Sequence, residues 1–294
     1  MKHTRRPVTL LDIVLLLGIV AGSIYLVYRI KVGLQYRWNW GVIPQYLFRY
    51  DAQRAVWVPN LLMQGFFTTI RLSVWTTLLG TVLGTIMGLF RISGSAYKRM
   101  LGRTYVEIVR NLPPLVLVFL FYFFFSDQIM AALNVDGLVR NLSPSTKQVL
   151  GWFFAPPARF SAFLSALMTL ALYEGAYITE IIRAGIQSIE RGQWEASSAL
   201  GMSWWQQMRH IVLPQAMQRI LPALAGQFIS TIKDSAIVSV ISIQELTFQG
   251  TELMAATYLP IEVWITVTVL YFVLTFSCSL AVGKLEQSFH RNRA

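Results

Sequence analysis

Hydrophobic residues gather along the chain into long, nearly uninterrupted segments that are separated by short polar stretches. Five of these segments are long enough to form a helix of about 20 residues, the length that crosses the hydrocarbon core of a bilayer. They run over about Leu61–Phe90, Tyr105–Ser126, Phe160–Ile182, Leu221–Ile243 and Ile261–Val282. The pattern predicts an all-α protein, a polytopic transmembrane helical bundle with a five-span core.

A sixth apolar segment precedes this core. The chain begins with the basic stretch MKHTRRPVTL and continues with mostly apolar residues from Leu10 to Ile30. That run is longer than the roughly 7–15 apolar residues of a signal peptide, so it predicts an uncleaved anchor helix. We therefore expect an N-terminal anchor helix with an external segment in residues 1–60, followed by a transmembrane domain in residues 61–290.

Composition supports an integral membrane protein. Of the 294 residues, 55% are hydrophobic and only 13% are charged, whereas a soluble domain carries about a quarter charged residues. The net charge of +11 does not indicate a nucleic-acid partner, because the basic residues lie in short blocks between apolar segments, as in loops that face anionic lipid. The single cysteine, Cys278, excludes an intramolecular disulfide and a cysteine-based metal cluster.

The basic blocks on alternate sides of the predicted spans are unequal. One side carries Lys2, Arg5, Arg6, Arg91, Lys98, Arg99, Arg103, Arg183, Arg191, Arg209, Arg219, Lys284, Arg291 and Arg293; the other carries Lys31, Arg37, Arg49, Arg54, Arg140 and Lys147. The richer side is expected to be cytoplasmic. This predicts cytoplasmic termini, and external segments over residues 31–60 and 127–159.

Three glycines recur at intervals of four residues in the first core span: Gly80, Gly84 and Gly88. On a helix they form a flat stripe that another backbone can approach closely. The spacing predicts tight packing of this span against a second span of the same subunit, with a contact between subunits as the alternative.

Known catalytic signatures are absent from the sequence. There is no phosphate-binding GxxxxGK[ST], and no HExxH, CxxC, GxSxG or GxGxxG. The three histidines, at positions 3, 210 and 290, are too scattered to suggest a metal site. We expect no catalysis by this chain and no cofactor in it, so uphill transport would take its energy from an ion gradient or from another polypeptide.

One polar stretch, QWEASSALGMSWWQQMRHIVLPQAM at 193–217, interrupts the apolar pattern. Its Glu195-Ala196-Ser197, then Gly201, then Ile211, Leu213 and Pro214 resemble the EAA loop of ABC importer permeases: E-A-A, three residues, G, nine residues, I-x-L-P. Ser197 in place of the second alanine is the one departure. Flanking stretches EIVRNLPPLVLVFLFYF, YEGAYITEIIRAGIQSIERGQWEA and LPALAGQFISTIKDSAIVSVISIQEL resemble the branch that takes up polar amino acids, including histidine, glutamine and glutamate permeases.

This resemblance covers roughly residues 60–290 and implies a type I importer permease core with a cytoplasmic coupling loop at about 184–216. The seven motif residues would then form the surface that couples to an ATPase. The local sequence fits such a rigid projection: a helix from Gln193 to Leu200 would end at Gly201, which can adopt a positive φ. A second helix from Trp204 to Leu213 would follow, with Pro214 opening the next segment. An ordinary amphipathic cytoplasmic loop is the alternative.

Polar and charged residues inside a bilayer are costly and generally face a cavity or a partner. An amino acid needs an acceptor for its ammonium group, for which Glu174 and Asp234 are candidates. Its carboxylate needs donors, for which Arg110, Asn111 and Lys233 are candidates, helped by backbone groups freed at Pro113-Pro114. Internal pairing is the alternative, and for Glu180 and Arg183 it is the expectation.

The sequence and the resemblance together predict the permease subunit of an importer for polar amino acids, in a bacterial inner (plasma) membrane. Its implied partners are a cytoplasmic ABC ATPase dimer, which would use ATP and Mg²⁺, the same or a sister permease subunit, a periplasmic amino-acid-binding protein, and membrane lipid. An ion-coupled secondary amino-acid carrier is the main alternative, although the chain shows no paired halves. A membrane-embedded enzyme is a third, which the absence of catalytic motifs disfavours.

Overall fold

The computed structural model of the protein describes residues 9–33 and 36–291. Four of the basic residues used to predict orientation, Lys2, Arg5, Arg6 and Arg293, lie outside the described residues. The chain forms two compact units, Met1–Trp40 and Gly41–Ala294. This division falls before residues 41–60, which the sequence grouped with the anchor.

The first unit consists mainly of one helix, α1 (Leu10–Gly33). Thr9 precedes the helix, and the carboxylate of Asp12 accepts hydrogen bonds from the backbone amide and the hydroxyl of Thr9, both at 2.8 Å. The described apolar side chains of α1 are exposed, for example Leu10 at 82% and Ile19 at 66%. These features fit the predicted anchor helix, which remains a prediction.

Five helical segments in the described residues are long and apolar enough to cross a membrane, at Leu61–Ile92, Pro114–Ala132, Pro157–Gln187, Trp204–Ile241 and Pro260–Lys284. The five-span core is therefore confirmed. The spans comprise α3 (Leu61–Ile92), α5 (Pro114–Leu120) with α6 (Asp127–Ala132), α9 (Phe160–Gln187), α12 (Leu213–Asp234) and α14 (Pro260–Arg291).

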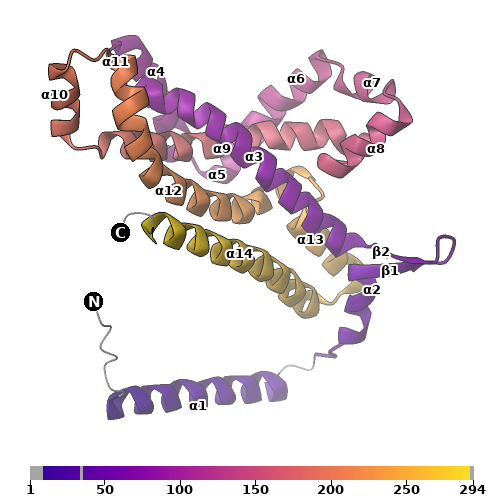
Figure 1. The fold of residues 1–294 in the computed structure, drawn as a ribbon. Coiled ribbons are helices and arrows are strands. Elements are labelled where there is room, and N and C mark those ends of the chain that lie inside the picture. Colours follow the sequence, from indigo (N-terminus) through magenta and orange to yellow (C-terminus); the bar gives the residue numbers. More distant parts are fainter. Residues whose placement is uncertain (1–8, 34–35, 292–294) are drawn as a thin grey trace. The chain divides into compact units, whose positions relative to one another are not determined.

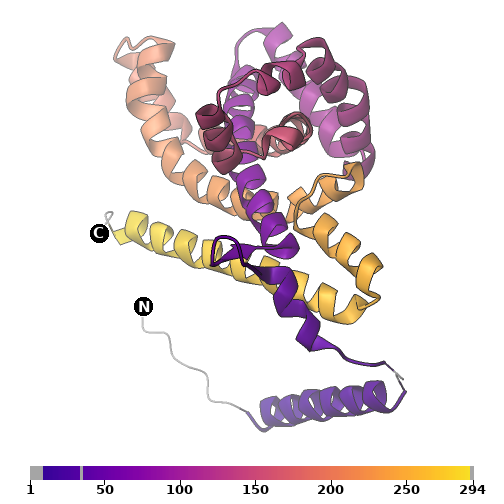
Figure 2. The same ribbon diagram turned by 90° about the vertical axis from the view of Figure 1, so that its right-hand side faces the viewer.

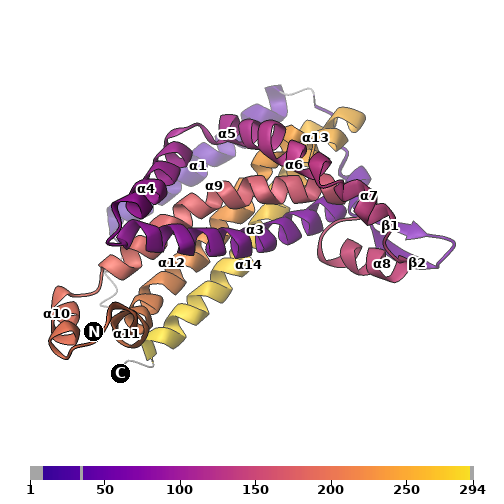
Figure 3. The same ribbon diagram turned by 90° about the horizontal axis from the view of Figure 1, so that it is seen from above.

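Helix α9 is the most enclosed of the five spans. Within its 18-residue apolar window 72% of the residues are buried, against 6% for the corresponding window of α14. Helices α3 and α9 lie side by side along most of their length (Figure 3). Helix α14 must therefore cover its apolar surface with lipid or with another protein, whereas α9 is covered by this chain.

The glycine stripe of α3 forms this contact, as predicted for packing within one subunit. A Cβ atom on Gly84 would lie 2.6 Å from Cγ2 of Ile178, and one on Gly88 would lie 2.9 Å from Cβ of Ile182. Any larger residue would therefore push α3 away from α9.

The second predicted span, Tyr105–Ser126, is wrong at its start. Residues 96–111 form a separate helix, α4 (Ala96–Asn111), and Leu112 has an extended backbone with φ −92° and ψ 146°. The reason is the pair Pro113-Pro114, which lacks amide donors and disfavours a helical residue directly before it. Pro114 then starts α5, followed by a π-helical turn, η2 (Phe121–Ser126).

The fourth predicted span also differs from the structure. Pro214 does not begin a new segment: α11 (Trp204–Gln207), the π-helical turn η4 (Met208–Val212) and α12 follow one another as one continuous helix. The wide π turn relieves the clash between the ring of Pro214 and the carbonyl group four residues earlier. Asp234 ends α12, and the 3₁₀ helix η5 (Ser235–Ile241) follows, so Lys233 and Asp234 lie near an end of this span rather than at its centre.

Short elements gather at the two ends of the second unit. At one end, 3₁₀ helix η1 (Trp40–Val42), α2 (Ile43–Leu47) and a hairpin of β1 (Phe48–Asp51) and β2 (Val56–Pro59) precede α3. The strands are antiparallel, with Phe48 opposite Pro59 and Asp51 opposite Val56. Between the second and third spans lie α7 (Val135–Arg140), α8 (Pro144–Phe153) and 3₁₀ helix η3 (Pro157–Arg159); α13 (Leu246–Thr257) precedes α14.

The opposite end of the unit carries a small hairpin of helices, α10 (Arg191–Ala199) and α11. It extends from the ends of α9 and α12 that are remote from the β hairpin (Figure 1). When the unit is viewed from the side of α6–α8, these helices lie in front and the α10–α11 hairpin lies at the back (Figure 2). We use "α10–α11 hairpin" for residues 191–214, the two helices together with the turn η4 and the first residues of α12.

Candidate functional site

A buried carboxyl group lies between α9 and α12. The side chain of Glu174 is 0% exposed, and its Oε2 accepts a hydrogen bond from Nε2 of Gln227 at 2.7 Å. The side chains of Thr231 and Asp234 also interact with this carboxyl group, but no donor among the described residues lies within 3.5 Å of its Oε1 in hydrogen-bonding geometry. A buried acceptor without a donor is costly, so this oxygen is suited to receive a donor from a bound molecule.

Asp234 adds a second carboxyl group to this place. It is half-buried at the end of α12, where it interacts electrostatically with Glu174. Thr231, one turn earlier on α12, is fully buried and donates its hydroxyl proton to the carbonyl of Gln227 at 3.0 Å. We call Glu174, Gln227 and Asp234 the carboxylate cluster; it brings together the two acceptors that the sequence predicted.

Arg110 is connected to the carboxylate cluster by two tyrosines. Its guanidinium carbon lies 5.4 Å from the ring centroid of Tyr177, a cation–π contact. The hydroxyl groups of Tyr177 and Tyr173 are 3.2 Å apart, and Tyr173 interacts electrostatically with Asp234 and Glu174. A cation and two carboxyl groups are thus arranged in sequence from α4 to α12.

The other two predicted donors are not part of this arrangement. The amide nitrogen of Asn111 donates to the carbonyl of Glu107 at 2.8 Å and to its carboxylate at 3.0 Å. Lys233 is exposed and forms no ion pair with Asp234 within the range of residues that the structure describes. Neither residue lies with the carboxylate cluster, so the structure does not support the predicted roles of Asn111 and Lys233 in binding.

The predicted pairing of Glu180 with Arg183 is confirmed. Oε2 of Glu180 accepts hydrogen bonds from Nε and Nη2 of Arg183 at 2.9 and 2.8 Å. Arg91 at the end of α3 pairs with the other carboxylate oxygen of Glu180. This two-armed ion pair joins α3 to α9 at the end of the bundle that carries the α10–α11 hairpin.

The turn of the α10–α11 hairpin depends on Gly201, whose φ is +73° as predicted. The amide of Gly201 donates to the carbonyl of Ser198 at 2.9 Å, and that of Met202 donates to Ser197 at 3.2 Å, which ends α10 with a left-handed residue. Ser203 then caps α11 by reciprocal bonds with Gln206, at 2.8 and 3.4 Å. A Cβ atom on Gly201 would meet nothing within 4 Å, so its backbone conformation, and not space, requires glycine.

Side-chain bonds hold the two helices of the hairpin together. Nε2 of Gln207 donates to Oγ of Ser198 at 3.0 Å and to the carbonyl of Met202 at 2.9 Å. Ser197 is 3% exposed and donates to the carbonyl of Trp194 at 2.9 Å, which explains why a small residue is needed there. The hairpin is therefore a rigid unit.

The motif residues divide into an inner and an outer set. Ile211 and Leu213 pack against a buried cluster formed with Ile186, Met208 and Val212, which attaches the hairpin to α9 and α12. Glu195, Ala196, Gly201 and Pro214 are exposed. The carboxylate of Glu195 lies 3.3 Å from Nε of Arg191, an exposed pair that contributes little to stability.

Sequence analysis did not predict several residues of the α10–α11 hairpin and several beside the carboxylate cluster. The apolar tip of the hairpin includes Leu200, which is 81% exposed, and Trp205, which is 74% exposed. Their position beside the predicted turn at Gly201 could have indicated an exposed apolar surface. Tyr173 and Tyr177 are four residues apart, the spacing of neighbours on a helix face. No group of three or more potential metal ligands occurs among residues 9–33 and 36–291.

Comparisons with known proteins identify the family. Residues 80–291, well over half of the chain, match the family described as "Binding-protein-dependent transport system inner membrane component". The chain is 33% identical over 233 residues to the "Probable glutamine ABC transporter permease protein GlnM" of Bacillus subtilis (strain 168), covering 79% of this chain and 95% of that protein. It is 33% identical over 240 residues to the "Glutamate/aspartate import permease protein GltK" of Escherichia coli O157:H7, covering 81% and 98%.

A solved structure gives the same result. The chain resembles one described as "Crystal structure of an amino acid ABC transporter with histidines", with a TM-score of 0.65, 28% identity, and coverage of 86% of this chain and 100% of that one. The fold and the relatives define a multi-pass inner membrane permease of the ABC importer type. The chain belongs to the family of inner membrane components of binding-protein-dependent transport systems. The predicted resemblance to amino-acid permeases is confirmed, and the ion-coupled carrier is not supported.

Proposed function

We propose that the chain is the permease subunit through which a polar amino acid crosses the membrane after delivery by a periplasmic binding protein. The carboxylate cluster is the substrate site and the α10–α11 hairpin is the coupling element. Energy comes from a partner ATPase dimer that binds ATP with Mg²⁺. The proposal extends the family assignment with the substrates named for its relatives, glutamine and glutamate/aspartate.

The buried carboxyl group of Glu174 is the observation that carries the substrate site. One of its oxygens is oriented by Gln227 and the other has no donor in hydrogen-bonding geometry among the described residues. A substrate ammonium group would supply the missing donors, and Asp234 would add a second acceptor. Arg110, held over Tyr177, is the best placed of the predicted cations to receive the carboxylate of the same molecule.

The α10–α11 hairpin has the properties required to transmit force. Its two helices are held together by Gln207, and Ile211 and Leu213 attach them to the spans. Exposed Glu195, Leu200 and Trp205 form the surface offered to the ATPase. Because closing of an ATP-bound ATPase dimer would fit only one arrangement of two such hairpins, ATP binding would favour one orientation of the spans, and hydrolysis would reverse the preference.

A second permease subunit, either identical or a sister chain, completes the transporter in this proposal. Helix α14 leaves most of its apolar surface uncovered by this chain, which is consistent with contacts to a partner or to lipid. Both termini and the α10–α11 hairpin lie in the cytoplasm, as the distribution of basic residues predicts.

The substrate site is tested by uptake into proteoliposomes that contain the permease, its ATPase and its binding protein. A panel of labelled glutamine, glutamate, arginine and histidine identifies the substrate. Glu174→Gln should lower uptake of that substrate by about tenfold or more, since it removes a charge-assisted bond, while the amount of assembled complex changes little. The exposed Glu252→Gln on α13 is the matched control. Loss of folded complex with Glu174→Gln would instead indicate a structural role.

Orientation is tested by labelling single cysteines, with Cys278 replaced by serine. Leu138→Cys on α7 should react with a membrane-impermeant reagent from outside, and Leu200→Cys in the α10–α11 hairpin should react only after permeabilisation. Both positions are well exposed, at 64% and 81%. Labelling of Leu200→Cys in intact cells would contradict the proposed orientation.

A further inference from the structure

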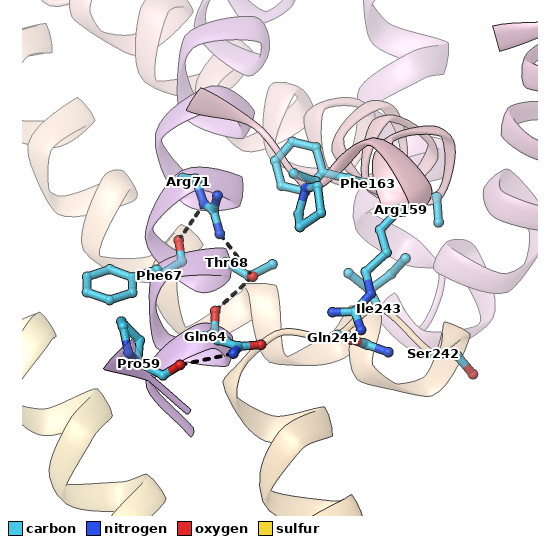
Figure 4. A pocket seen from close by; sticks show the side chains of 13 residues that line it. Pro59, Gln64, Phe67, Thr68, Arg71, Arg159, Phe163, Ser242, Ile243 and Gln244 are labelled. Carbon is cyan, nitrogen blue, oxygen red and sulfur yellow. Dashed lines mark hydrogen bonds between the residues drawn. The ribbon is translucent and has the colours of Figure 1, made fainter. Parts of the chain in front are cut away.

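A separate cavity of about 440 Å³ lies at the end of the bundle that is remote from the α10–α11 hairpin. It is bounded by the first turns of α3, the segment that joins α8 to α9, and the linker 242–244 between η5 and α13 (Figure 4). Its walls include Phe67 and Phe163, and its polar groups come from Gln64, Thr68, Arg71, Arg159 and Gln244. We call it the arginine cavity. None of its lining residues belongs to the carboxylate cluster.

Arg71 is held in a fixed orientation on the wall of the arginine cavity. Its Nη1 donates to the carbonyl of Gly151 at 2.7 Å, and its Nε donates to that of Phe67 at 3.2 Å. Its Nη2 has only a 3.5 Å contact with the hydroxyl of Thr68. Two bonds to backbone carbonyls thus position the guanidinium group, while Nη2 keeps donors for another acceptor.

Arg159 contributes a second guanidinium group from η3. It is exposed, and it forms no ion pair within the described part of the chain. No aspartate or glutamate lines the arginine cavity. Two positive charges therefore face a concave space without a carboxylate to balance them, an arrangement that favours a bound anion.

The cavity also offers acceptors beside these donors. Oε1 of Gln244 is buried and has no hydrogen-bond partner among the described residues. Gln64 donates through Nε2 to the carbonyl of Pro59 at 3.0 Å, which leaves its oxygen available. Donors for a carboxylate and acceptors for an ammonium group thus line one cavity, whose volume lies within the range of small-molecule sites, about 300–1,000 Å³.

We propose that the arginine cavity is a second binding site for a free amino acid, whose α-carboxylate is held by Arg71 and Arg159. This inference rests on the proposed function, since the ligand is the substrate of the importer. The site precedes the carboxylate cluster on the path from the β-hairpin end of the bundle. A small zwitterion can use both the donors and the acceptors that line the cavity, whereas a lipid phosphate would use the donors alone.

Equilibrium binding tests the proposal. The permease–ATPase complex in nanodiscs, without binding protein, is titrated with the labelled amino acid that the uptake panel selects. Glu174→Gln should leave one class of sites, and adding Arg159→Gln should weaken those sites about tenfold, because a charge-assisted bond is lost. Arg140→Gln on α7, also exposed and near the same end of the bundle but outside the cavity, is the matched control and should have no effect.

Competition by an analogue without the α-carboxylate provides a second test. The α-carboxamide of the same amino acid should compete poorly for the remaining sites, and Arg159→Gln should abolish this discrimination. Ala162→Trp, in an otherwise unaltered protein, should fill the cavity and remove one of the two classes of sites, which keeps the test valid if Glu174→Gln lowers the yield of complex. The proposal would be overturned if Arg159→Gln left the affinity of the remaining sites unchanged, or if the carboxamide competed as well as the amino acid.

A lipid phosphate or an acidic group of the binding protein would respond differently to Arg159→Gln. If Arg159→Gln changes binding only in nanodiscs with phosphatidylglycerol and not in phosphatidylcholine alone, the cavity holds a lipid phosphate and the proposal is wrong. It is also wrong if the substitution weakens docking of the unliganded binding protein and leaves amino-acid binding unchanged. Failure of the uptake panel would reject the proposed function itself, whereas normal uptake with a single class of binding sites rejects only the second site.

Discussion

The α10–α11 hairpin and the α3–α9 interface both depend on glycine, but for different physical reasons. Gly201 in the hairpin has a φ of +73° and open space around its missing side chain. Gly84 in the interface has an ordinary helical backbone, and a Cβ atom there would lie 2.6 Å from Ile178. The first glycine sets a direction of the chain, and the second sets a distance between two helices.

The two regions also differ in how exposed their carboxylates are. Glu195 in the hairpin is 70% exposed and needs no partner for folding, so its charge is available to another protein. Glu174, on the helix that packs against Gly84, is fully buried and fixed by Gln227. Changes in the hairpin should therefore uncouple a folded protein, whereas overpacking of the interface should prevent folding.

The largest effect is expected from Gly84→Val. The added methyl groups would collide with Ile178 and with the carbonyl of Gly175, which lies 3.0 Å from the ideal Cβ position. Overpacking of this kind costs about 1–3 kcal/mol, and here it separates the two most extensively packed spans. We expect a much lower yield and melting temperature of the purified complex.

Gly226→Val on α12 is the control for this experiment, because a Cβ atom there would meet nothing within 4 Å. It introduces the same side chain into another membrane-spanning helix and should leave the melting temperature nearly unchanged. Equal destabilisation by both substitutions would mean that helix propensity, and not the contact with α9, is responsible.

An intermediate effect is expected from Glu195→Lys. The residue is exposed, so the free energy of unfolding should change by less than about 0.5 kcal/mol. Charge reversal on a docking surface should lower recovery of the ATPase with the permease by about tenfold. Co-purification measures this, with the exposed Glu252→Lys on α13 as the control. Normal recovery with Glu195→Lys would exclude this carboxylate from the docking surface.

The third effect is a pH dependence at Glu245, which caps α13 and links it to α3 and α14. Its side chain accepts hydrogen bonds from the amide of Phe248 at 2.7 Å and from the hydroxyl of Tyr271 at 2.7 Å. Burial raises the pKa of Glu245 from 4.5 to about 7, although these hydrogen bonds favour the charged form. This residue lies outside the five membrane-spanning segments.

A raised pKa makes stability depend on pH. Between pH 4.5 and 7 the folded protein retains a proton on Glu245 that the unfolded chain has released. The free energy of unfolding should therefore fall as pH rises through this interval, by up to about 1.4 kcal/mol per pH unit. Glu245→Gln should flatten the dependence when melting temperatures are compared across this range. An unchanged slope would show that Glu245 is already charged in the folded protein.

The sequence predicted the local features of both regions. The turn at Gly201 and the end of α10 follow from short-range rules, because a left-handed residue and its capping bonds involve neighbours in the chain. The glycine stripe was visible for the same reason, as a regular spacing on one helix. The boundary at Pro113-Pro114 was recognisable too, but the predicted span ignored it and began at Tyr105.

The carboxylate cluster could be predicted only in part. Glu174 and Asp234 stand out as charges in apolar segments, yet their proximity depends on how α9 and α12 pack. Lys233 stands out equally but is exposed, because adjacent residues on a helix point about 100° apart. The π turn before Pro214 and the arginine cavity likewise arise from contacts between segments that are distant in sequence.

The most direct test of the account measures ATPase activity in the reconstituted transporter with Gly201→Val. Valine at a positive φ costs about 1 kcal/mol or more and redirects α11, while the carboxylate cluster is far from the change. Gly192→Val in α10, where φ is not positive and nothing lies within 4 Å, is the control. We predict that hydrolysis no longer responds to the loaded binding protein in Gly201→Val and responds normally in the control. Normal stimulation and docking in Gly201→Val would contradict a coupling role for the hairpin.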